Sequence, residues 1–333
     1  MVPGSTALAA RIVSRTPMRY RHGADPGEDR PAHVRAASGL VRFDGALVVV
    51  QDDAHFLGVV DAATGLTDPI ALPPGPGGRR TFDRARGNKA DKLDLEAAFA
   101  LAGDDDDGGL LVAIGSGAPL GPRRSVVTVR RADSGWAAAV HALPRWFDAI
   151  AAALLPAGTS LNLEGAAVIG DQLIVANRGG DAGHGGIASP DALVATPLAA
   201  WRRLLDDPAA PLPPLAIRRL DAGALDGVAL HVTDLASAHG RLWFLATAEA
   251  TTSFFDDGPV AGSAIGVLAP AGERARWAPV TGADGAVAHD KLEGLAATDD
   301  ARRWLAVIDP DDPDRPSELV ELALDGDWLD DRP

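Results

Sequence analysis

Short apolar segments alternate with polar turns along most of the chain, and one such pattern recurs. In each repeat a polar residue, often followed by Gly, precedes a short apolar strand, a polar turn and a second strand rich in Leu and Val. Short strands separated by turns such as Asp44-Gly45, Gly170-Asp171 and His239-Gly240 are typical of antiparallel hairpins. The repeats begin near residues 36, 93, 161, 231 and 290, and further strand-like segments follow each of them.

Tandem antiparallel units of this size are typical of a β-propeller. We therefore expect an all-β fold in which residues 1–333 form one propeller domain, with five blades as the first interpretation and six as the second. A pair of β-sandwiches is the alternative fold, but the repeated leading motif counts against it. Residues 10–20 precede the first repeat and are expected to add an outer strand to the last blade, closing the ring.

Two segments depart from the strand pattern. Aromatic and aliphatic residues of 144–155 have helical spacing and predict an amphipathic helix. A second helix is expected to run to about Asp206, with Thr196 as N-cap and Pro197 at the first helical position. Both helices are expected to pack on the flank of the propeller.

Composition narrows the classes of function. The 333 residues include 46 Asp and Glu against 31 Lys and Arg, and this net charge of −15 disfavours binding to nucleic acid or to an anionic membrane. The absence of Cys excludes disulfides, thiolate metal sites and cysteine nucleophiles. No apolar run has the length of a membrane span, and the N-terminal segment has no continuous apolar core of a signal peptide. We expect a soluble, cytoplasmic monomer that binds a small molecule.

The polar residue that leads each repeat occupies an equivalent position. Ser38, Glu164 and Thr233 stand at the same distance before the second-strand leucine of their repeats, and Glu96 and Glu293 are the equivalents where the turn is longer. The first strand of each blade lines the central channel of a propeller, so these five side chains are expected to form a ring. Carboxylates crowded in a narrow channel resist ionisation. An oxygen-only ring suits a hard cation, and Ca²⁺ fits it better than Mg²⁺.

A second interpretation needs no metal. Lys92 and Lys291 lie close in sequence to Glu96 and Glu293, so lysines can neutralise the ring, or its carboxylates can take up protons. A bound metal could also serve only to tie the blades together.

The register of the hairpins places candidate catalytic and binding residues on the same side of the molecule as the ring. Counting back from the turns puts Glu164 opposite Asn177 and Ser38 opposite Gln51, so the polar loops after the second strands open on that face. Side chains there can act as general bases or hold an anionic group, although each type is also common in solvated loops. The candidates are Asp52, Asp53, His55 and His184 as bases, and Arg123, Arg124, Arg178, Lys92 and Lys291 as cationic groups.

Other metal-binding and catalytic motifs are weak or absent in the sequence. The acidic run at 104–107 is interpreted as a solvated turn, because it lacks the ligand spacing of an EF-hand. The motifs of serine hydrolases, zinc proteases and P-loop proteins are absent. Two hypotheses remain: a metal-dependent hydrolase of a small phosphorylated or ester substrate, and a non-catalytic propeller with a structural calcium that binds a ligand or protein partner.

The order hydroxyl, Glu, Glu, hydroxyl, Glu, with Lys-Leu-Glu-Gly at 291–294, resembles the five-bladed calcium-activated nucleotidase (apyrase) family. The segments LEGAAVI and LEGLAATDD also resemble the esterase-like phytase and uncharacterised bacterial propeller families. The first resemblance implies one Ca²⁺ in the central tunnel that supports nucleotide hydrolysis, with Lys92 and Lys291 near the substrate. Two features depart from that family: Thr233 stands where it has Ser, and Lys92 lies four residues before its glutamate instead of two. The implied ligands are Ser38, Glu96, Glu164, Thr233 and Glu293.

Overall fold

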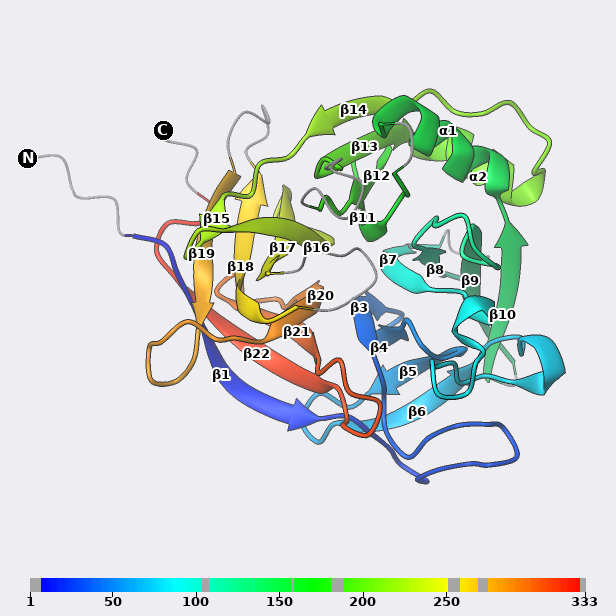
Figure 1. The fold of residues 1–333 in the computed structure, drawn as a ribbon, viewed down its shortest axis with the longest axis horizontal. Helices are drawn as coiled ribbons and strands as arrows, with labels where there is room; N and C mark the ends of the chain where they lie inside the picture. The colour runs from blue at the N-terminus through cyan, green and yellow to red at the C-terminus, as the bar shows by residue number, and fades with distance from the viewer. Residues whose placement is uncertain are drawn as a thin grey trace, which may run out of the picture.

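The computed structural model describes residues 7–103, 108–133, 135–156, 159–180, 189–250, 258–268 and 275–329. Two features noted above, His184 and the acidic run at 104–107, lie outside these ranges. Within them, the strands form four hydrogen-bonded sheets arranged around a common centre (Figure 1). The described chain has no helix that is both long enough and apolar enough to cross a membrane.

Three of the sheets are antiparallel meanders built from consecutive strands. The first also carries a two-residue strand, β2, which pairs in parallel with the outer strand β6. In chain order the strands of the three sheets are β2 (Arg19–Tyr20), β3 (Ala37–Phe43), β4 (Ala46–Gln51), β5 (Phe56–Val60) and β6 (Leu66–Ala71); β7 (Leu95–Leu101), β8 (Leu110–Gly115), β9 (Ser125–Ala132) and β10 (Gly135–Ala142); and β11 (Leu163–Ile169), β12 (Gln172–Asn177), β13 (Ala192–Pro197) and β14 (Ala216–Arg219).

The fourth sheet is longer because the N-terminal strand joins two meanders. Strand β1 pairs in antiparallel with β22 along its length, and two residues at its start pair in parallel with β19. Segment 10–20 therefore supplies the strand outside β22. The order is β15 (Ala224–Leu225), β16 (Val228–Ala238), β17 (Arg241–Glu249), β18 (Val260–Leu268), β19 (Ala275–Thr281), β1 (Ala9–Pro17), β22 (Glu318–Asp325), β21 (Arg303–Asp309) and β20 (Lys291–Ala297).

The first long strand of each meander faces the centre. Strand β3 contacts β7, β7 contacts β11, β11 contacts β16, β16 contacts β20, and β20 returns to β3. These inner strands therefore form a closed ring of neighbours (Figure 1). This arrangement confirms the prediction of a mostly-β fold of the propeller type, in which first strands line the axis.

The predicted hairpin turns form as expected. Phe43 pairs with Ala46 across Asp44-Gly45, and both turn residues have positive φ, 50° and 74°. His239-Gly240 has the same conformation, with φ of 52° and 71°. A two-residue turn with two positive φ angles matches the twist of the flanking strands, and Gly adopts that conformation without a Cβ clash.

Two helices cover the outer junction between the second and third sheets, as the sequence predicts. Helix α1 (Pro144–Leu154) and helix α2 (Leu198–Asp206) share one core with strands of both sheets, and the rings of Trp146 and Trp201 pack edge-on at 6.0 Å. The predicted cap of α2 is wrong. Thr196 continues strand β13, its hydroxyl donates to Pro214, and Pro197 takes the N-cap position without a side-chain cap.

A buried carboxylate ties two inner strands together. Asp234 in β16 is 2% exposed, and it accepts backbone N–H bonds from its neighbour Leu235 and from Leu295 in β20, both at 2.7 Å. Asp234→Ala would leave both donors buried without a partner. We expect the free energy of unfolding to fall by roughly 2–4 kcal/mol, measured by urea denaturation. The exposed Ser237→Ala on the same strand is the control, and equal stability of the two variants would contradict this role.

Candidate functional site

Each inner strand contains a β-bulge, and the extra residue is in every case the polar residue predicted from the repeat. The register shifts fall between residues 37 and 39, 95 and 97, 163 and 165, 232 and 234, and 292 and 294. The five positions are therefore structurally equivalent, as the sequence alignment of the repeats implies. The bulged residues are Ser38, Glu96, Glu164, Thr233 and Glu293.

The bulges correct one detail of the predicted register. Leu163, not Glu164, pairs with Asn177, and Ala37, not Ser38, pairs with Gln51. Counting back from the turn fails by one residue because the extra residue of a bulge has no partner on the second strand. A bulge also re-aims its side chain. On an inner edge strand, a re-aimed side chain can turn toward the centre of the ring of strands.

The two hydroxyls of the set connect neighbouring inner strands. Ser38 Oγ donates to the carbonyl oxygen of Leu95 at 2.5 Å, and Thr233 Oγ1 donates to that of Leu292 at 2.7 Å. Each acceptor immediately precedes the bulged glutamate of the next strand. Both hydroxyl groups are buried, with each residue 1% exposed. Each hydroxyl proton is therefore held by a backbone carbonyl, and the oxygen remains able to accept.

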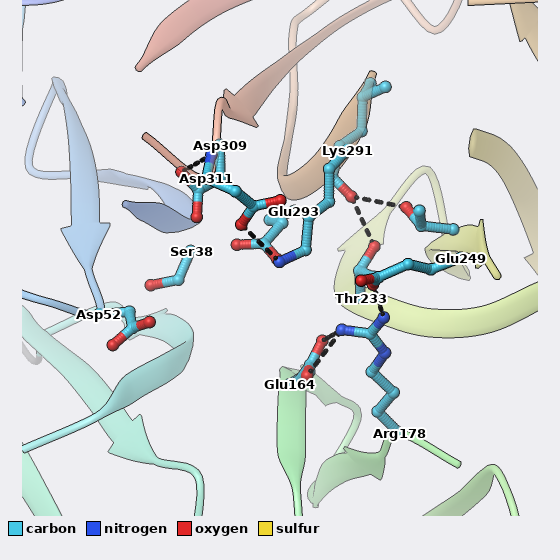
Figure 2. Close-up of polar contacts among 12 residues, drawn as sticks. Ser38, Asp52, Glu164, Arg178, Thr233, Glu249, Lys291, Glu293, Asp309 and Asp311 are labelled. Carbon is cyan, nitrogen blue, oxygen red and sulfur yellow. Dashed lines mark hydrogen bonds and ion pairs between the residues drawn. The ribbon is translucent and has the colours of Figure 1, made fainter. Parts of the chain in front are cut away.

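Glu164 belongs to an ion-pair network with Arg178 (Figure 2). One guanidinium nitrogen of Arg178 donates to both carboxylate oxygens of Glu164, at 3.1 and 3.3 Å, and the other donates to Glu249 at 2.7 Å. Asn162 donates to Glu164 at 2.6 Å. Arg178 thus bridges the inner strand of the third sheet to β17.

Lys291 forms the corresponding network on β20 (Figure 2). Its ammonium group lies 3.0 Å from Glu293 and 3.1 Å from Asp311, and the carboxylate of Asp309 accepts the backbone N–H of Asp311. Lys291, Glu293 and Asp309 are each less than 10% exposed. More negative than positive groups therefore meet at this side of the ring.

Lys92 is the cation of a third network, which the sequence indicated only in part. The ammonium group bonds to Asp52, and it lies 3.1 Å from Asp53 and 2.7 Å from Asp94. Asp94 also accepts from Ser116 and lies 3.4 Å from Arg123.

Among the described residues, one group of three acidic side chains has ligand oxygens that all lie within 4.8 Å of one another: Asp52, Asp94 and Glu96. Sequence reasoning selected Asp52 and Glu96 but missed Asp94. The available signal was alternation, because Asp94 and Glu96 stand two residues apart as strand β7 begins.

His55, a candidate base, is buried and makes contacts with the backbone. His55 is 3% exposed and both of its ring nitrogens are used: Nδ1 contacts the carbonyl of Pro73 at 3.0 Å, and Nε2 accepts the N–H of Leu93 at 3.1 Å. Its pKa is lowered to about 4, chiefly by burial. Both ring nitrogens of His55 therefore contact the backbone, which leaves no lone pair for a proton from water.

Comparison with known families gives a single assignment. The model of the family of unknown function DUF6929 matches residues 33–324. The chain belongs to this family. No curated protein matches the sequence. The description of the family names no activity, so the residues of this DUF6929 protein must carry any functional argument.

Solved structures resemble this DUF6929 protein only distantly. Glutaminyl cyclase of Myxococcus xanthus shares 12% identity, with 97% of this chain and 100% of that chain covered and a TM-score of 0.42. An ACO/RPE65 chimera shares 10% identity at a TM-score of 0.33, covering 84% of this chain and 55% of that one. AztD of Citrobacter koseri shares 11% at a TM-score of 0.25, covering 81% and 52%. The chain thus spans about half of the last two proteins.

Burial controls the ionisation of the central carboxylates in the DUF6929 protein. It raises the pKa of Asp52 to about 8, with Asp53 and Asp94 adding to the effect and Lys92 opposing it. It likewise raises the pKa of Glu293 to about 7 against the influence of Lys291. The pKa of Glu96 lies well above its ordinary value, because burial is reinforced by the charges of nearby carboxylates. A cation at the centre would favour the ionised forms of all three groups.

Proposed function

We propose that this protein is a five-bladed β-propeller that binds Ca²⁺ at its centre. In this proposal the nine-stranded sheet counts as two blades that β1 joins at their outer edges. The observation that supports the metal site is the equivalence of the bulges, since every inner strand has an acidic or hydroxyl residue at its bulge. The ligands would be Ser38, Glu96, Glu164, Thr233 and Glu293.

The donor set fits a hard cation. It contains only oxygen atoms, from three carboxylates and two hydroxyl groups whose protons are held by backbone carbonyls. Ca²⁺ accepts six to eight oxygens in flexible geometry. Asp52 and Asp94 lie close enough to Glu96 to supply further oxygens. The raised pKa values of Glu96 and Glu293 also indicate a surplus of negative charge that a cation would relieve.

We further propose that the centre hydrolyses a small phosphorylated or carboxylic ester. Bound Ca²⁺ would supply a positive charge that polarises the phosphoryl or carbonyl oxygen of the substrate. Lys92, Arg178 and Lys291 lie around the same centre and would hold anionic groups of the substrate and steady developing negative charge. Asp52 lies beside Lys92 in the same centre, and bound Ca²⁺ would keep its carboxylate ionised.

One observation favours the second candidate, a propeller whose calcium is structural. Arg178 and Lys291 already form ion pairs with Glu164 and Glu293, so two of the three ring glutamates have partners without a metal. In that case the ring would join the blades, and the face above it would bind a ligand or protein.

Calorimetric titration with Ca²⁺ and a substrate panel in Ca²⁺ or EGTA separate these candidates. The panel contains nucleoside diphosphates, p-nitrophenyl phosphate, p-nitrophenyl acetate and lactones. Binding of about one Ca²⁺ per chain with turnover that EGTA abolishes is the expected result. Binding that raises only the melting temperature supports the structural candidate. Absence of any Ca²⁺ binding contradicts both and leaves the ion-paired ring as the interpretation.

A further inference from the structure

A histidine and an aspartate form a pair that the sequence pattern did not indicate. His231 Nδ1 lies 2.6 Å from Asp191 Oδ2, and the other oxygen of Asp191 accepts the backbone N–H of Val232 at 2.8 Å. The side chains of His231 and Asp191 are 14% and 9% exposed. An ionised carboxylate only accepts hydrogen bonds, so Nδ1 carries the proton of the neutral imidazole and Nε2 carries the lone pair.

The Nε2 atom of His231 is not fully buried. It makes no hydrogen bond in the described part of the chain, and it is not among the buried side-chain nitrogens that lack a partner there. His55 differs in this respect, because both of its nitrogens contact the backbone. His231 therefore has a basic nitrogen with a fixed tautomer and access to water.

Strand position places His231 beside the proposed metal ligands. It stands on β16 two residues before the bulged Thr233, which corresponds to about 7 Å along a strand. At the equivalent position of other inner strands, Lys291 contacts Glu293 at 3.0 Å and Asn162 contacts Glu164 at 2.6 Å.

The second sheet follows the same rule, since Asp94 and the bulged Glu96 belong to one group of ligand atoms within 4.8 Å. In three strands the residue two before the bulge thus adjoins the ring. His231 occupies the fourth such position.

We propose that Asp191 and His231 are the general-base unit of the central site, a proposal that rests on the hydrolase function above. His231 would be a catalytic residue that touches the attacking water, and Asp191 a positioning residue that orients it. The oxygen of one water molecule forms a bond to the phosphorus or acyl carbon of the ester while Nε2 takes its proton. The bond to the leaving oxygen then breaks, and the imidazolium returns the proton to that oxygen.

If Asp191 and His231 only join the two sheets, loss of the basic nitrogen of His231 should have no effect on activity. The contact of Asp191 with Val232 joins the third and fourth sheets without His231. In His231→Asn, the amide nitrogen can replace Nδ1 as donor to Asp191, whereas nothing replaces Nε2. This substitution therefore removes the basic nitrogen and leaves the connection between sheets in place.

The test compares wild type, His231→Asn and His231→Ala on p-nitrophenyl phosphate and p-nitrophenyl acetate in Ca²⁺. We expect kcat of His231→Asn to fall about 100-fold or more with little change in KM, and the rise of activity with pH that reports the base to disappear. Added imidazole is expected to restore part of the activity of His231→Ala. The control is His239→Asn, an exposed turn histidine with φ of 52° that Asn readily adopts.

Unchanged kcat and pH profile in His231→Asn would overturn the general-base role while leaving the hydrolase proposal intact. No turnover by the wild-type protein would overturn both. A measurement without substrate adds an independent outcome: ¹H–¹⁵N spectra of histidine-labelled protein, assigned with His231→Asn, should show a proton on Nδ1 in neutral His231. A proton on Nε2 instead would also overturn the proposal.

Discussion

Glu96→Gln is expected to weaken the binding of Ca²⁺ by at least ~100-fold, since loss of even an outer-shell partner of a metal costs 10–100-fold. Glu96 is the ring glutamate with no hydrogen bond or ion pair in the described chain, whereas Glu164 and Glu293 contact Arg178 and Lys291. Its carboxyl group is therefore the one most available to a cation. Calorimetric titration measures the affinity directly.

The same substitution should leave the calcium-free protein as stable as wild type, or slightly more stable. The pKa of Glu96 is well above its ordinary value because of burial and the nearby Asp52 and Asp94, so its folded form prefers the neutral carboxyl that Gln resembles. The melting temperature in EGTA checks this. Glu321→Gln is the control, since this half-buried glutamate in β22 lies on an outer strand and pairs with Arg303. Equal Ca²⁺ affinity of Glu96→Gln and wild type would remove Glu96 from the proposed ligands.

Lys291→Met is expected to lower the free energy of unfolding by about 3–5 kcal/mol at pH 8.5, because it leaves buried carboxylates without their cation. Lys291 is 9% exposed and contacts Glu293 and Asp311. Met has a similar length but no charge, so the change isolates the electrostatic contribution. Denaturation with urea in EGTA measures the difference.

The deficit should shrink as the pH falls. Glu293 has a pKa of about 7 in the folded protein, above its ordinary value, so the folded state binds more protons than the unfolded state between about pH 4.5 and 7. Stability therefore falls as the pH rises through this range. Without Lys291 the pKa of Glu293 rises further, which extends the loss above pH 7. At pH 5.5 Glu293 is protonated in both proteins, so its contribution to the difference disappears, and the deficit is smaller than at pH 8.5.

Lys89→Met is the matched control for this experiment. Lys89 lies in a short 3-10 helix, η2 (Lys89–Asp91), is only half-buried and has no ion pair in the described chain, so we expect a change within about 0.5 kcal/mol at either pH. A pH-independent deficit in Lys291→Met would show that packing of the side chain, rather than neutralisation of Glu293, stabilises the ring. Recovery of the deficit by Ca²⁺ would indicate that a cation can substitute for the lysine.

The repeat made the fold class and the position of the ring predictable. Local features were sufficient for this: apolar segments of strand length, turns such as Asp44-Gly45 whose residues tolerate positive φ, and a polar residue at a constant distance before the second strand. Helix α1 was predictable for the same reason, since the spacing of its apolar residues depends only on its own sequence.

The contacts of the ring residues could not be predicted from the sequence. The bulges at Ser38 and Glu164 shift the pairing by one residue, and nothing in the spacing of the repeats distinguishes a bulged residue from a paired one. Thr196 has the properties of a helix cap, but its hydroxyl bonds to Pro214, and only the folded chain brings the two together.

The sequence by itself determined that this protein forms a mostly-β propeller with equivalent acidic and hydroxyl residues on its inner strands, because periodicity and turn chemistry are local properties. The tertiary structure decided which charges meet: Arg178 with Glu164 and Glu249, and His231 with Asp191. These partners lie up to 71 residues apart. Their pairing depends on how neighbouring sheets pack, and burial where the sheets meet raises the pKa of Glu164.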